Sequence, residues 1–101
     1  EGGIFSLSVY YATEGGRNAD KHLLITFTAS DANGTVSGVT FSHTLSSDTS
    51  GRPWGPVTGT TGADGTVTFT LKNAPGGCFS VTVHSADDGW DNTVTDPGLC
   101  K

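Results

Sequence analysis

Apolar and polar residues alternate with a period of two along most of this chain. Such a period puts successive side chains on opposite faces of an extended strand, so it predicts strands with one apolar face. The pattern is clearest at residues 65–72, where Val67, Phe69 and Leu71 alternate with threonines. Similar alternation is found at 5–11, 22–30, 38–45 and 78–84, and weaker alternation at 56–61 and 90–95. The predicted strands therefore number seven.

The apolar set of each strand predicts the residues of a hydrophobic core. Seven short strands with turn signals every 8–12 residues are typical of an antiparallel immunoglobulin-like β-sandwich. His43 falls on an apolar face, where a hydrogen-bonded core histidine is a better interpretation than a catalytic base. The other residues expected to face inward are Phe5, Leu7, Val9, Tyr11, Leu23, Ile25, Phe27, Ala29, Val39, Phe41, Leu45, Val67, Phe69, Leu71, Phe79, Val81 and Val83.

Turn-forming residues separate the predicted strands. Asn33 and Gly34 form a pair that tolerates positive φ at both central positions of a hairpin turn, and residues 63–65 repeat this chemistry. The segment 46–56 is the longest connection without periodicity. We expect it to be an exposed loop that crosses between the two sheets.

Length and composition agree with a small all-β domain. The chain has 101 residues, which suits one domain over 1–101, and it is rich in glycine, with 15 residues. It begins at Glu1 without methionine, which fits a mature or excised piece of a larger secreted protein. No apolar run approaches the length of a membrane span. The net charge is −5 and the five lysines and arginines are scattered in sequence, which argues against nucleic acid as a partner.

The chain has two cysteines, Cys78 and Cys100. An even count in an acidic domain rich in glycine, serine and threonine predicts one disulfide and an oxidising, extracellular compartment. The bond would close a loop of about 22 residues and stabilise the fold by about 3 kcal/mol on the chain-entropy account. Two free thiols are the alternative, whereas a zinc site lacks the usual ligand spacing.

Three stretches carry a resemblance to a known group of domains. DANGTVSGVTFSHTL at 31–45, GTTGADGTVTFT at 59–70, and FSVTV at 79–83 followed by GWD at 89–91 resemble runs of bacterial immunoglobulin-like modules. The resemblance covers roughly residues 6–96 and consists of strand and turn motifs. It implies the sandwich fold and a place in secreted proteases, glycosidases or surface proteins, and it transfers no catalytic residue.

Catalytic and metal-binding chemistry have weak signals. The three histidines fall in different predicted strands, and no nucleophile-elbow motif is present, so we expect no enzyme activity. Asp87, Asp88 and Asp91 form an acidic run that could supply oxygen ligands to calcium. A solvated acidic turn explains the same run, and no other cofactor is indicated.

Aromatic residues provide the candidates for carbohydrate binding, because sugar rings stack on exposed aromatic faces. Tyr10 and Tyr11 are adjacent, so one of them must face away from the core. Trp54 lies in the long polar connection, where anchoring the loop is the alternative role. Trp90 is followed by Asp91 and Asn92, which could bind hydroxyls, but it could equally cap the end of the sandwich.

Two main functional hypotheses follow. The first is a non-catalytic accessory or spacer module of a secreted multidomain protein such as a hydrolase, with neighbouring domains as partners. The second is a module that binds a polysaccharide and so raises the local concentration of its parent enzyme at the substrate. An adhesive domain of a surface protein is a third alternative, since a fold does not decide among these.

Overall fold

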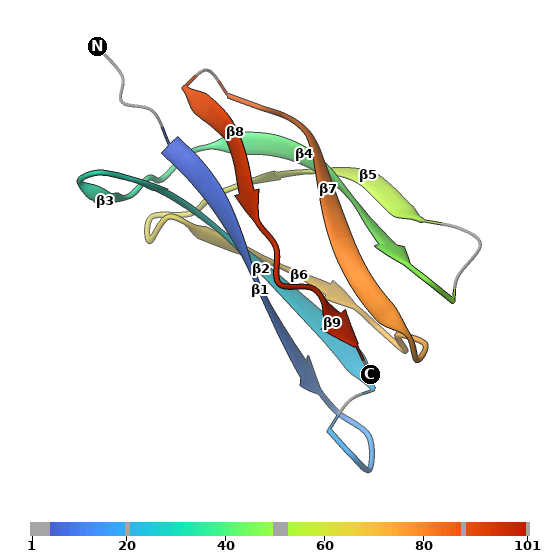
Figure 1. Ribbon diagram of the computed structural model, residues 1–101. Coiled ribbons are helices and arrows are strands. Elements are labelled where there is room, and N and C mark those ends of the chain that lie inside the picture. The colour runs from blue at the N-terminus through green and yellow to red at the C-terminus, as the bar shows by residue number, and fades with distance from the viewer. Residues whose placement is uncertain (1–4, 20, 50–52, 88, 101) are drawn as a thin grey trace.

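The computed structural model describes residues 5–19, 21–49, 53–87 and 89–100, and these contain nine strands and no helix (Figure 1). The strands are β1 (Phe5–Glu14), β2 (His22–Asp31), β3 (Gly34–Thr35), β4 (Thr40–Ser47), β5 (Trp54–Thr60), β6 (Thr66–Leu71), β7 (Cys78–Ala86), β8 (Trp90–Thr95) and β9 (Leu99–Cys100).

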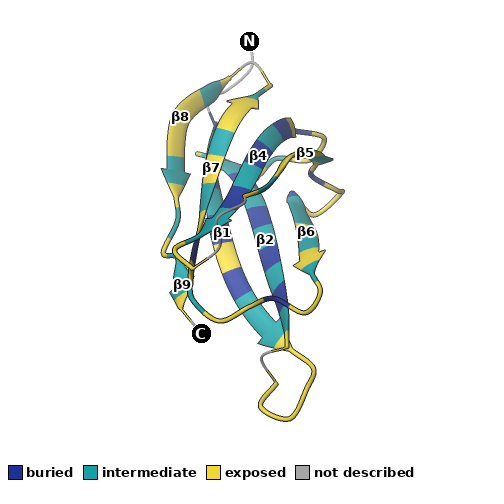
Figure 2. Ribbon diagram, turned by 90° about the vertical axis from the view of Figure 1, so that its right-hand side faces the viewer, coloured by how far each residue is buried: buried dark blue, intermediate teal, exposed yellow. Residues whose placement is uncertain are grey.

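The strands form two sheets that face each other across the core (Figures 1 and 2). In the first sheet β2 lies between β1 and β6, β8 flanks β1, and the short β3 extends the edge of β2. In the second sheet the order is β5-β4-β7-β9. The prediction of an all-β sandwich is therefore confirmed at the level of two packed sheets.

The strand count and one strand direction differ from the prediction. Two of the nine strands, β3 and β9, have only two residues and are too short to show a period in sequence. The pairing of β8 with β1 is parallel, whereas the other strand pairs of the described residues are antiparallel. The direction follows from the path of the chain. β7 ends where β1 begins, as the hydrogen bond from Phe5 N to Gly89 O shows, so β8 returns alongside β1 in the same direction.

The core lies between the sheets, where the alternation placed it. Phe27, Phe41 and Phe79 are the largest fully buried side chains, and the rings of Phe27 and Phe41 are 4.7 Å apart. The inward sets expected on β1, β2 and β4 are buried. Those of β6 and the later part of β7 are only partly buried, because they pack against the core from its margins.

Hydroxyl groups dominate the outer faces of both sheets. Thr26 and Thr68, on neighbouring strands of the first sheet, have their hydroxyl oxygens 2.9 Å apart. On the second sheet the hydroxyls of Thr40 and Thr60 are 3.0 Å apart. Threonine suits this position because its β-branched side chain packs well on a pleated surface and its hydroxyl bonds across strands.

Two connections differ from their predicted form. In the hairpin after β2, Asp31 pairs with Gly34, so Ala32 and Asn33 form the tip, and Gly34 alone of the Asn-Gly pair takes a positive φ, of 125°. The segment after β4 does not cross between sheets, because β5 pairs with β4 in the same sheet. The crossing comes one connection later, at residues 61–65, between β5 and β6.

The body is elongated, with extents of 48 × 24 × 19 Å. β1 begins at one end of the long axis and β9 ends toward the other (Figures 1 and 2). The described chain therefore enters and leaves the sandwich at opposite ends.

Candidate functional site

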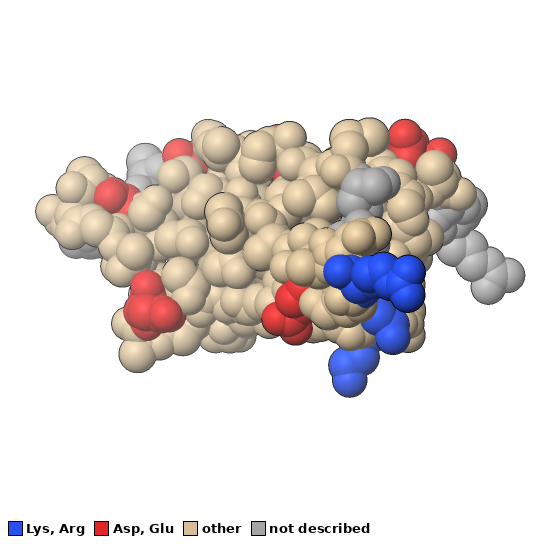
Figure 3. Space-filling view, turned by 90° about the horizontal axis from the view of Figure 1, so that it is seen from below, with Lys and Arg blue, Asp and Glu red and all other residues tan. Residues whose placement is uncertain are grey.

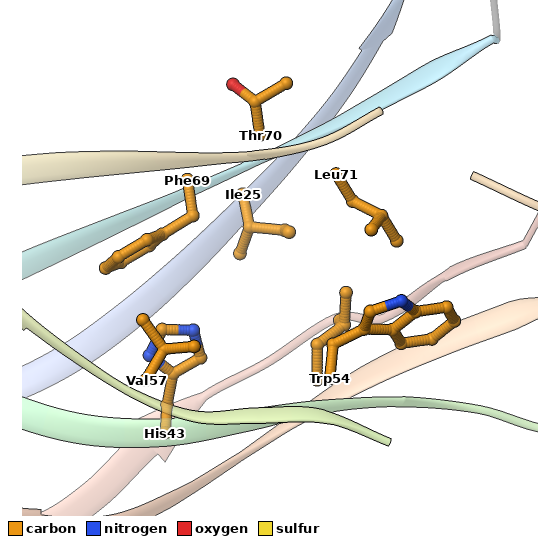
Figure 4. A pocket seen from close by; sticks show the side chains of 8 residues that line it. Ile25, His43, Trp54, Val57, Phe69, Thr70 and Leu71 are labelled. Atoms are coloured by element: carbon orange, nitrogen blue, oxygen red, sulfur yellow. The ribbon is translucent and has the colours of Figure 1, made fainter. Parts of the chain in front are cut away.

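The two lateral margins of the sandwich differ, and the apolar side chains of one margin line a cavity. β5 and β6 are the edge strands of their sheets, and each has a paired neighbour on one side only among the described strands. A cavity of about 310 Å³ lies between them, which we call the β5–β6 opening. It is lined by Ile25, His43, Leu45, Trp54, Val57, Phe69, Thr70 and Leu71 (Figure 4).

A β-bulge shapes one wall of this opening. In the pairing of β4 with β5, His43 is opposite Val57 and Leu45 is opposite Trp54, with a register shift between them. Strict alternation would put Trp54 and Val57 on opposite faces of β5, because they are three residues apart. The bulge resets the alternation, so both side chains reach the cavity.

Phe69 closes the opening at one level. A Cβ atom at Gly59 would collide with the Phe69 ring, so the ring packs directly on the bare backbone of β5. The ring also contacts His43, at 4.6 Å between centroids. Val57, two residues before Gly59 on β5, also lines the cavity, and it is 39% exposed to solvent at the cavity entrance.

His43 is the polar residue of this apolar region. Its side chain is only 3% exposed, and it packs against Phe27 at 4.6 Å between ring centroids. Among the residues that the structure describes, its buried Nδ1 atom has no hydrogen-bond partner. Burial, and to a smaller extent the charge of His84, lowers the pKa of His43, so the imidazole is neutral near pH 7. The prediction of a core histidine is confirmed, but its expected hydrogen bond is absent at Nδ1.

The opposite margin is closed by the chain itself. Between β8 and β9, residues 96–98 carry the chain from the first sheet to the second, and we call this segment the β8–β9 crossing. Asp96 accepts three hydrogen bonds there: from Tyr11 Oη at 2.7 Å, from Val81 N at 2.8 Å and from Gly98 N at 2.9 Å. The carboxylate thus joins β1 of one sheet to β7 of the other.

Tyr11 is held in place by this carboxylate. It is 7% exposed, and burial together with the hydrogen bond to Asp96 raises the pKa of its hydroxyl. A phenol fixed in this way is a structural donor. Its ring is not available at the surface for stacking on a ligand.

A disulfide joins Cys78 to Cys100 next to the same margin. The two residues are directly opposite each other on β7 and β9, and both are exposed. The predicted disulfide is confirmed, and free cysteines are absent. The bond holds the two-residue strand β9, which has few backbone hydrogen bonds of its own.

The three aromatic candidates other than the inward-facing Tyr11 lie in separate places. Tyr10 is 67% exposed on the outer face of the first sheet, as expected once Tyr11 faces inward. Trp54 is partly buried, packs on Phe79 at 5.9 Å between ring centroids and lines the β5–β6 opening. Trp90 is also partly buried, at the start of β8, and its indole Nε1 donates to Thr93 O at 3.1 Å. The four candidates therefore do not form one aligned aromatic row.

The described acidic candidates accept hydrogen bonds from backbone N–H groups, across strands for Asp87 and within a turn for Asp91. Asp87 Oδ2 accepts from Thr40 N at 2.9 Å, and Asp91 Oδ1 accepts from Thr93 N at 2.8 Å. Asn92 takes a positive φ of 66°, at an irregular part of the β1–β8 pairing. Asp88 lies outside the described residues. Within the described ranges no group of three histidine, cysteine or acidic side chains is placed to hold a metal ion, so calcium stays a prediction without support.

The described cations, Arg17, Lys21 and Lys72, gather at one end although they are scattered in sequence (Figure 3). Lys21 O accepts a hydrogen bond from Ala74 N, which brings the β1–β2 and β6–β7 connections together. Three charges are few beside the six to ten phosphate contacts of a typical DNA-binding protein. The described part of the chain also has no helix long and apolar enough to cross a membrane.

Sequence reasoning missed two features of these margins. Asp96 was one more acidic residue near the chain end, and nothing local to it indicated partners in β1 and β7. The cavity depends on the β4–β5 bulge, and a bulge has no period to detect. The one signal available was a polar residue, His43, at a core position of β4.

Comparisons with known protein families, with curated proteins and with solved structures found no match to this chain. The resemblance of its turn and strand motifs to bacterial immunoglobulin-like modules therefore stays a prediction.

Proposed function

We propose that this chain is a non-catalytic accessory module of a secreted multidomain protein, in which an immunoglobulin-like sandwich acts as a load-bearing spacer. The observation that carries the proposal is the position of the chain ends. Phe5 lies beside Gly89 at the end of the body where β7 finishes, and Cys100 is bonded to Cys78 where β7 starts. Neighbours joined at these two points would be held apart along the long axis.

The strand order supports the immunoglobulin-like part of the proposal. β1, β2 and β6 share one sheet, and β4, β5 and β7 share the other, with the last strand segment switching between them. This division of the strands supports a Greek-key sandwich of that class, although β8 lies in the first sheet, whereas the last strand of the class lies in the second.

The pairing of β1 supports a mechanical role. β1 lies between β2 and β8, and it bonds to β2 over nine residue pairs from Ser6 to Glu14. A pull on Phe5 along the strand axis acts across these hydrogen bonds, which are roughly perpendicular to antiparallel strands. Many bonds would share the load, whereas a pull across the sheet would open them one at a time.

The disulfide supports the same role by changing the path of the force. A pull on Cys100 passes through the Cys78–Cys100 bond to the start of β7. The 22-residue separation between the cysteines is then taken out of the loaded path. The module would lengthen less on unfolding, which keeps flanking domains closer together.

Single-molecule pulling between the two chain ends tests the spacer proposal. The oxidised domain, set between marker domains, should unfold in one step. Reduction of the disulfide should lengthen that step by roughly 75 Å, the extended length of about 22 residues.

A second pulling direction provides the control. Handles at Asn33 and Ala63, both exposed in turns near one end, would peel β6 from β2 and should open the domain at a several-fold lower force. Equal forces in the two directions would count against a load-bearing role.

Carbohydrate binding stays the alternative. The exposed ring of Tyr10, surrounded by hydroxyl-bearing residues, is the feature that favours it. A pull-down of the domain on cellulose, chitin, xylan and starch, with and without EDTA, tests both this alternative and calcium. Retention that is lost in Tyr10→Ala would favour a binding module over a spacer.

A further inference from the structure

The β5–β6 opening combines an apolar cavity with one buried polar group. Its volume of about 310 Å³ is at the lower end of the range for small-molecule sites, roughly 300–1,000 Å³. Side chains from β2, β4, β5 and β6 line it, so both sheets contribute to its walls. Figure 4 shows His43 rising from β4 toward Ile25 and Phe69, with Val57 beside it.

The lining selects against charged ligands. Seven of the eight lining residues are apolar or threonine, and the eighth is His43, which burial keeps neutral. A carboxylate or ammonium group placed here would lose its hydration without gaining an opposite charge. A matching ligand is therefore neutral over most of its surface.

His43 adds a requirement for one polar group. Its Nδ1 has no partner among the described residues and is closed off from the opening, so a ligand gains a hydrogen bond to it once the ring turns toward the opening. A neutral imidazole has one N–H donor and one acceptor nitrogen. A hydroxyl group can both donate and accept, so it suits either tautomer of His43.

Size and lining narrow the apolar part of the ligand. A cavity of about 150 Å³ holds benzene, so twice that volume suits about two fused rings. Phe69 and Trp54 offer aromatic surfaces, and Leu71 adds an aliphatic one (Figure 4). We propose that the β5–β6 opening binds a small, neutral, bicyclic aromatic alcohol, whose hydroxyl bonds to His43 and whose rings pack against Phe69, Leu71 and Trp54. This site is independent of the spacer role, which depends on β1, β8 and the disulfide.

Nuclear magnetic resonance on the ¹⁵N-labelled domain tests the proposal. 1-Naphthol should give saturable shifts at the amides of Ile25, Val57 and Leu71 and at the Trp54 indole. Naphthalene, which lacks the hydroxyl, should bind at least tenfold more weakly, and 1-naphthoate should not bind there. Tyr10 and Trp90, which lie outside the opening, should not shift.

Three variants make the result decisive. His43→Phe should retain the fold and abolish the preference for naphthol over naphthalene. His84→Gln is the matched control, because His84 is exposed on the other face of the same sheet, bonded to Thr44 at 2.6 Å, and the preference should survive. Val57→Trp should block the mouth and weaken both ligands without touching His43. If His43→Phe does not fold, Val57→Trp alone decides whether the shifts come from the opening.

Other outcomes would overturn the proposal. Absence of saturable shifts with 1-naphthol, equal affinity for the two neutral ligands, or an unchanged preference in His43→Phe would each do so. The pulling experiments test the spacer proposal alone. A negative ligand-binding result therefore leaves that proposal standing, and a negative pulling result leaves the ligand site standing.

Discussion

The two margins of this sandwich close the space between the sheets in different ways. At the β8–β9 crossing the chain itself passes from one sheet to the other, and Asp96 hydrogen-bonds to Tyr11 and to the backbone of β7. At the β5–β6 opening the described chain crosses between the sheets at residues 61–65, and the gap between the two edge strands is bounded by apolar side chains and one unsatisfied histidine. The first margin is held by satisfied hydrogen bonds, whereas the second is held by apolar packing around a cavity.

The difference shows how stability and binding are separated within a small domain. A buried polar group contributes stability when its hydrogen bonds are satisfied, and it costs stability when they are not. Asp96 is of the first kind and His43 of the second. A site that is less stable than its surroundings is a natural place for ligand binding, because a ligand can supply the missing contacts.

The largest contrast is expected for two leucines. Leu7→Ala, at a fully buried position of β1 opposite Val94 of β8, should destabilise the domain by about 4 kcal/mol, since it leaves a cavity in a closed core. Leu71→Ala, at the partly buried margin, should cost about 1 to 2 kcal/mol, because the space there is already open. Urea unfolding of both variants measures the pair, and equal losses would mean that the two margins are packed alike.

Asp96→Ala should destabilise the domain by about 3 kcal/mol, because it removes the acceptor of three hydrogen bonds, two of which connect different strands. Tyr11→Phe should cost about 1 kcal/mol, since Asp96 keeps its two backbone donors. Thermal and urea denaturation measure both changes. A double variant no less stable than Asp96→Ala alone would show that the two losses share one contact.

Removal of the disulfide in a Cys78→Ala, Cys100→Ala variant should cost about 3 kcal/mol through the entropy of the unfolded chain. The naphthol site should be unaffected, because the disulfide lies away from the opening. A variant that loses the ligand shifts while remaining folded would contradict the independence of the two margins.

The smallest expected effect is the pH dependence from His43. Its pKa is lowered by folding, so the unfolded state takes up the proton first as the pH falls below about 6.5, and stability is lost. The loss between pH 7.5 and 5.5 should be about 1 kcal/mol larger in the wild type than in His43→Phe. Urea unfolding across this pH range checks it.

Periodicity predicted the parts of the molecule that depend on local order. The alternation at 22–30 placed Leu23, Ile25 and Phe27 in the core, and the weak pattern at 90–95 matched β8. It did not predict the parallel β1–β8 pairing, which depends on where β7 ends. It also expected a loop at Trp54, where a bulged strand brings the indole to the cavity.

The candidate site could be predicted only in part, because its contacts also join segments that are far apart in the sequence. His43 was singled out as a polar residue on an apolar face, but its lack of a partner depends on four strands from two sheets. Nothing near Asp96 in the sequence indicates its partners, because Tyr11 and Val81 come from distant segments. Contacts between distant segments have no signal within a single stretch of sequence.

The parallel pairing of β1 with β8 has a consequence for how the protein folds as it is made. Tyr11 and Asp96 are separated by 85 positions along the chain. When synthesis or export delivers the N-terminal residues first, β1 can pair with β2, but its other edge must wait until β8 emerges. The domain therefore reaches its native state only near the end of delivery, and folding dominated by such distant pairings is slow. During that interval the free edge of β1 is exposed to other chains.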